Sequence, residues 1–166
     1  MKILFCLLLL LLTTSCHHSP WQHTSIRNGN DRYDMAKLTY PSSNETNGIE
    51  LEMTRLGKEI HAYINVHCFE LPLNENDKHA TTLTISTNCA TRTFVIPLLE
   101  GGQRARLTDT CLEYLLQNLE LKPSVTLSSG HFSETLDASN FERHYDALLR
   151  KPSVIQPRSM ISLELF

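Results

Sequence analysis

The sequence predicts an α+β domain over residues 49–166, in which a mostly antiparallel β-sheet packs against two helices. Apolar and polar residues alternate through much of 49–69, 81–99 and 125–136, which is the pattern of strands with one buried face. Short turn segments separate these stretches and favour antiparallel pairing. Two other stretches, 108–122 and 140–150, carry apolar residues at helical spacing.

The first predicted hairpin turns at Gly57 and Lys58. Glycine readily takes the positive φ that a tight hairpin turn requires. With these two residues at the centre of the turn, the apolar residues of both strands fall on the same face. The predicted cross-strand pairs on the apolar face are Met53 with Ala62 and Leu51 with Ile64, and Leu56 faces Glu59 beside the turn.

Further hairpins follow the same logic. Residues 81–87 and 92–99 flank a turn at 88–91, and residues 125–128 and 132–136 flank a turn at 129–131. A tight turn at 100–103 precedes a short strand at 104–107. The alternating stretch 160–166 is predicted to be a terminal edge strand or a loosely held tail.

Two helices are predicted between and after these strands. Leu112, Leu115, Leu116 and Leu119 form the apolar stripe of the first, with Thr108 or Asp109 as its N-cap and Pro123 ending it. The second runs from about 140 to 150. Ser139 and Glu142 are spaced as a capping box there, and the predicted buried face consists of Phe141, Tyr145, Leu148 and Leu149.

The N-terminus is typical of an export signal. Lys2 precedes an unbroken apolar run over 3–12, and residues 13–15 are small. Ten residues make about 15 Å of helix, about half of a hydrocarbon core, so a permanent membrane span is not expected. Residues 1–15 are therefore predicted to be a signal peptide.

Ser15 followed by Cys16 resembles the cleavage site of bacterial lipoprotein precursors, although Thr13 stands where that family prefers leucine. The resemblance implies that Cys16 receives a diacylglycerol, that the chain is cut before it, and that the new amine is acylated. An ordinary secretory signal cut at the same bond is the alternative. His17 replaces the aspartate that marks inner-membrane retention in some members, so the resemblance favours the outer membrane, facing the periplasm or the surface.

Residues 16–48 are predicted to be the lipidated cysteine and a disordered tether, because polar residues, Gly, Pro and Ser dominate without any period. His17, His18 and His23 could attract a transition metal, but a solvated tether is favoured and no metal or cofactor is predicted. The charge of −3 becomes −4 when Lys2 leaves with the signal. The sequence has no block of basic residues, so binding to nucleic acid is not expected. The acyl chains alone are expected to attach the protein to the membrane.

One strand of the first hairpin offers a candidate binding surface: His61, Tyr63, Asn65 and His67 share its non-core face. The predicted register places Thr54, Glu52 and Glu50 opposite the first three. A solvent face or a face packed under a helix is the plain interpretation, and a ligand or partner surface is the alternative. The two histidines are about 20 Å apart along the strand, too far to share a metal.

Three cysteines remain after processing. Counting strand directions in a single sheet puts Cys89 and Cys111 at the same end, so they are the predicted disulfide, with Cys68 unpaired. Cys111 at a helix start could instead be a reactive thiolate.

No catalytic residue is predicted, because no nucleophile elbow, phosphate loop or complete metal site is present in the sequence. The expected function is a non-enzymatic binding or structural component of the envelope, with a possible envelope protein as partner. A carrier of a lipid or other apolar ligand is one alternative, and a hydrolase using His131 or His144 is another.

Overall fold

The computed structural model describes residues 19–26 and 35–150. The predictions for the signal, Cys16, His17, His18 and the stretch 160–166 lie outside the described residues. Within these ranges the elements are β1 (Gln22–Ile26), β2 (Met35–Tyr40), β3 (Glu50–Leu56), β4 (Glu59–Asn65), β5 (Ala80–Ser86), β6 (Thr91–Pro97), β7 (Arg104–Arg106), α2 (Asp109–Leu121), β8 (Ser124–Ser129), β9 (Phe132–Asp137) and α3 (Phe141–Leu149).

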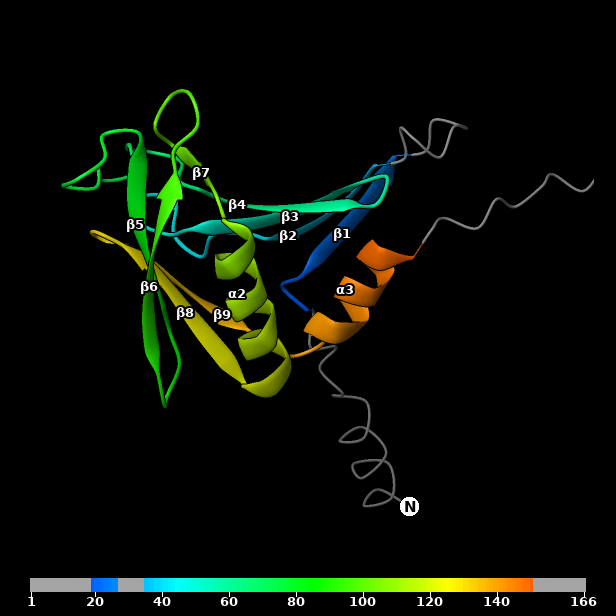
Figure 1. Ribbon diagram of the computed structural model, residues 1–166. Helices are drawn as coiled ribbons and strands as arrows, with labels where there is room; N and C mark the ends of the chain where they lie inside the picture. The colour runs from blue at the N-terminus through cyan, green and yellow to red at the C-terminus, as the bar shows by residue number, and fades with distance from the viewer. Residues whose placement is uncertain (1–18, 27–34, 151–166) are drawn as a thin grey trace, which may run out of the picture.

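The strands form two antiparallel sheets, which confirms the α+β prediction and divides its single sheet into two. The five-stranded sheet has the order β1-β2-β3-β4-β7, and the four-stranded sheet has the order β6-β5-β8-β9. Figure 1 shows the two sheets at a steep angle, with α2 and α3 inside that angle. Each sheet therefore has an inner face toward the helices and an outer face turned away from them.

The first hairpin has the register that its alternation predicts. Leu56 faces Glu59, Met53 faces Ala62 and Leu51 faces Ile64. Gly57 turns the chain with a φ of 61°. The hairpins β5–β6 and β8–β9 and the short strand β7 also form where they are expected.

The hydrophobic core lies between the inner faces of the two sheets and the helices. This core is continuous. Its residues come from the whole described part of the chain, from Trp21 just before β1 to Leu148 in α3, and include Leu51, Ile85 and Phe141. In α2 the buried residues are Cys111, Leu115 and Leu119. Burial of this apolar surface is the main contribution that stabilises the arrangement of the two sheets, and thereby positions their outer faces.

The prediction of a disordered tether over 17–48 is wrong for its described part. β1 and β2 extend the first hairpin to a four-stranded run, with β2 paired along β3. Trp21 is 2% exposed, its ring lies 4.9 Å from that of Tyr40 and 5.0 Å from that of Phe141, and its indole Nε1 donates to the Asp137 carbonyl at 2.8 Å. The folded domain therefore begins by Trp21 and not at residue 49.

The two helix N-termini differ in how well they were predicted. Thr108 caps α2, and its hydroxyl accepts from the Cys111 backbone N–H. The capping box expected for α3 does not form: Asn140 is the N-cap, with a φ of 62° and no side-chain cap hydrogen bond. The backbone N–H of Ser139 instead donates to the Asp137 carboxylate. Leu149, which was predicted to lie on the buried face of this helix, is exposed.

The predicted disulfide between Cys89 and Cys111 is also wrong. Both thiols are free, as is that of Cys68. Cys89 is exposed in the β5–β6 turn, whereas Cys111 is buried in the first turn of α2. Counting strand directions failed because β4 and β5 belong to different sheets, so their ends are not comparable.

Candidate functional site

The candidate site is the outer face of the five-stranded sheet. Its side chains alternate with the buried residues of the inner face, as the pleat of a strand requires. The predicted pairs Thr54–His61, Glu52–Tyr63 and Glu50–Asn65 are confirmed, and β2 and β7 add residues on either side. Because both helices pack on the other side, this face is not packed under a helix.

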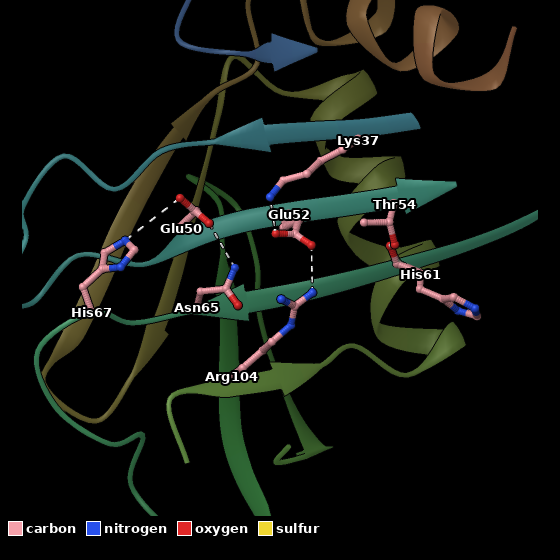
Figure 2. A network of polar contacts seen from close by, with 8 residues as sticks. All are labelled: Lys37, Glu50, Glu52, Thr54, His61, Asn65, His67 and Arg104. Carbon is pink, nitrogen blue, oxygen red and sulfur yellow. Dashed lines mark hydrogen bonds and ion pairs between the residues drawn. The ribbon is translucent and has the colours of Figure 1, made fainter. Parts of the chain in front are cut away.

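A buried carboxylate organises the centre of the face. Glu52 is 5% exposed, and its two oxygens meet Lys37 Nζ at 2.6 Å and Arg104 Nη2 at 2.7 Å. Figure 2 shows the two cations reaching Glu52 from opposite sides, one from β2 and one from β7. Burial raises the pKa of Glu52, but the hydrogen bond from Lys37 and the charge of Arg104 outweigh it, so the net pKa is lowered.

Arg104 is fixed by a second contact. Its guanidinium lies over the Tyr63 ring, 4.0 Å from the ring centroid, in the geometry of a cation–π interaction. Its Nε is buried without a hydrogen-bond partner among the described residues. The ion pair and the ring contact thus hold a Tyr–Arg pair in one conformation on an otherwise solvent-facing sheet.

The predicted residues do not converge on one point. Near one end of β4, Asn65 donates to Glu50 at 3.1 Å, and His67 Nε2 lies 4.0 Å from the other Glu50 oxygen. Toward the other end, Arg106 Nη2 lies 2.9 Å from His61 Nδ1, while His61 Nε2 lies 3.4 Å from Glu59. Arginine can only donate, so His61 Nδ1 is the acceptor. Among the described residues, no three His, Cys, Asp or Glu side chains are grouped as a metal site.

An exposed apolar row completes the face and was missed by sequence reasoning. Ile26, Met35 and Leu56 are direct cross-strand neighbours on β1, β2 and β3. They are 55%, 37% and 50% exposed. The alternation of each strand places all three on the outer face, at the end of the sheet where the β3–β4 hairpin turns. Finding this row requires β1 and β2, which the sequence pattern did not reveal.

Comparison with protein-family models, with curated proteins and with solved structures finds no match to this chain. No helix in the described ranges has the length and hydropathy needed to cross a membrane.

The histidines considered for a hydrolase lie elsewhere, and apart from each other. His131 is exposed, and its ring contacts the ring of Phe132 in a tilted arrangement and that of Phe69 edge-on. His144 borders a cleft of about 650 Å³ with His23, Glu142 and Asp146. Burial, together with the charges of Arg143 and His23, lowers the pKa of His144. No serine, threonine or cysteine is among the described residues that line this cleft, so it offers His144 no nucleophile.

Cys111 is not the reactive thiolate that its helix position allows. Burial raises the pKa of its thiol to about 12, although the charge of Arg92 acts in the opposite direction. The thiol is therefore protonated and packed in the core, like a small apolar side chain.

Proposed function

We propose that this chain is a lipid-anchored, non-enzymatic binding protein of a bacterial envelope, and that it holds a protein partner on the outer face of the five-stranded sheet. The observation that carries the proposal is that the exposed apolar row of Ile26, Met35 and Leu56 shares this face with the fixed Tyr63–Arg104 pair. Protein interfaces combine an apolar centre with a polar rim, and their strongest contacts are enriched in Tyr, Trp and Arg.

The rigidity of the charged groups supports binding rather than mere solvation. Long side chains normally lose rotamer freedom when a partner immobilises them, which weakens binding. Here Lys37 and Arg104 are already fixed on Glu52, and Arg104 also on Tyr63. Binding of a partner would therefore cost less side-chain entropy, because folding has already immobilised these side chains.

The anchor would hold the domain close to the membrane. Cys16 precedes the buried Trp21 by only five residues, which span at most about 18 Å when fully extended. A long tether of about thirty residues, as the composition suggested, is therefore replaced by a short link. Trp21 itself packs against Phe141 of α3, within the core of the domain.

Photo-crosslinking in the producing bacterium tests this proposal. A photoreactive amino acid placed at Thr39 or Thr54 on the outer face is expected to give a discrete crosslinked species. The same residue at Glu113, exposed on α2, serves as the matched control and is expected to give none.

The substitution Met35→Asp introduces a charge into the apolar row at an exposed position, so the fold is expected to survive. It should abolish the Thr39 crosslink while leaving the circular dichroism spectrum unchanged. Equal crosslinking from Glu113, or a crosslink that persists in the Met35→Asp variant, would overturn the proposed partner face.

A further inference from the structure

The outer face of the four-stranded sheet is a regular array of hydroxyl groups. One cross-strand row takes one residue from each strand: Thr93, Thr84, Ser128 and Ser133. A second row repeats this with Thr91, Ser86, Thr126 and Thr135. Neighbouring strands are about 4.8 Å apart and alternate residues about 7 Å apart along a strand. The two rows contain no charged side chain.

Hydroxyl pairs within the rows bond to each other. Thr84 and Thr93 are 3.3 Å apart, and Thr126 and Thr135 are 3.0 Å apart, oxygen to oxygen. A hydroxyl has one donor and two acceptor positions, so each pair keeps capacity for a ligand. None of the hydrogen bonds among the described residues uses the Ser128 hydroxyl.

A wall beside this array turns part of it into a cleft of about 440 Å³. Thr82, Thr84 and Ser128 form the floor, and the segment 72–76 lines the side. This volume is within the range of small-molecule sites.

The wall is built into the fold. Asn74 donates from its amide to Thr82 Oγ1 at 2.8 Å and accepts from the Asn76 backbone at 3.0 Å. Pro72 packs against Gly130 of the β8–β9 turn so closely that a Cβ there would lie 2.8 Å from Pro72 Cγ. These contacts fix the wall against the sheet at two points, so the shape of the cleft is set before any ligand enters.

The lining determines the chemistry of the ligand. No Lys, Arg or His is among the described residues that border the cleft, and Glu75 gives it a negative charge, which disfavours anions. The hydroxyls of its floor and the side-chain amides of its wall disfavour an apolar ligand, which would leave those groups without partners. Leu73, 58% exposed, and Pro72 add a small apolar wall.

We propose that this cleft binds a neutral saccharide chain. Sugar hydroxyls both donate and accept, matching Ser128, Thr84 and the side-chain amide of Asn76, and Glu75 can accept from them. The C–H face of a sugar ring would pack on Leu73 and Pro72. A glycan strand of the cell wall and a surface polysaccharide share this chemistry.

The test is an NMR titration of the mature chain, with Cys16→Ser to keep it free of lipid. The probes are soluble oligomers of N-acetylglucosamine, which represent the wall glycan, and of glucose, which represent other polysaccharides. Saturable amide shifts confined to 73–76, 82–84 and 128–130 are expected with one of the two. The oligomer that binds identifies the source.

Matched substitutions separate the cleft from the rest of the array. Ser128→Ala and Thr84→Val should each weaken binding about fivefold, the effect of one lost hydrogen bond. Ser133→Ala and Thr126→Val remove hydroxyls of the same rows outside the cleft and should change affinity less than about twofold. Absence of saturable shifts with both oligomers, or equal weakening by the control substitutions, would overturn the proposal.

Discussion

Replacement of Glu52 by Gln is the perturbation that most directly probes the fixed network. Glutamine keeps the shape but removes the charge and one acceptor, so either Lys37 or Arg104 loses its partner. Hydrogen bonds to charged groups contribute about 1.5–3 kcal/mol, and an exposed ion pair about 0–1 kcal/mol. The Glu52 side chain is 7% exposed but both cations are 38% exposed and can be rehydrated. We therefore expect a loss of about 2 kcal/mol in the free energy of unfolding.

Urea denaturation followed by circular dichroism measures this loss. Glu50→Gln is the matched control: it lies on the same strand and face, and the amide still accepts from Asn65, so its cost should stay within about 0.5 kcal/mol. The lowered pKa of Glu52 means that its contribution is present above the unfolded-state pKa of about 4.3 and is lost as the pH falls through the folded value. The difference between wild type and Glu52→Gln should therefore shrink in acid. Equal stabilities of the wild type and Glu52→Gln at pH 7, or an equal loss of stability in Glu50→Gln, would refute the reasoning.

Three further outcomes follow from the packing. Trp21→Ala should cost about 3–5 kcal/mol in urea denaturation, the range for removing a large aromatic side chain from a core; a cost near zero would show that this segment is a tether. Arg55→Met should cost about 3 kcal/mol by the same assay, because the buried guanidinium donates to carbonyls at the end of α3, and a loss below about 1 kcal/mol would contradict this. In a native thiol titration at pH 8, Cys68 and Cys89 should react rapidly and Cys111 only after unfolding; rapid reaction of all three would contradict its burial.

The first hairpin could be predicted from sequence because two independent signals agree on it. The alternation of Leu51 and Met53 defines a buried face, and Gly57 defines the turn, so the register has a single solution. The candidate residues His61 and Tyr63 follow directly from that register. The register of a hairpin is therefore predictable from residues that are close together in the sequence.

β1 and β2 could not be predicted in the same way. β1 is an edge strand with polar residues at most positions, and it gains its conformation from pairing with β2. β2 does alternate, with Ala36, Leu38 and Tyr40 buried, but six residues beside a polar stretch give a weak signal. The apolar row was missed for the same reason.

The remaining errors concern long-range arrangement. Lys37, Glu52 and Arg104 meet because β2 and β7 lie on opposite sides of the β3–β4 hairpin, and no spacing in the sequence encodes that order. The separation into two sheets likewise removed the basis for joining Cys89 to Cys111. Alternation defines which face a residue occupies, whereas sheet order depends on the sum of many tertiary contacts.

Intact mass spectrometry of the mature chain, isolated from the membranes of the producing cell, tests the anchored binding protein most directly. The account predicts a chain that begins at Cys16 and carries a diacylglycerol on its thiol and an acyl group on its amine, and that enters the detergent phase on partitioning. Because Trp21 follows the lipidated cysteine by only five positions, the domain would then work at the membrane surface. A mature chain with unmodified Cys16 that remains in the aqueous phase would contradict the account.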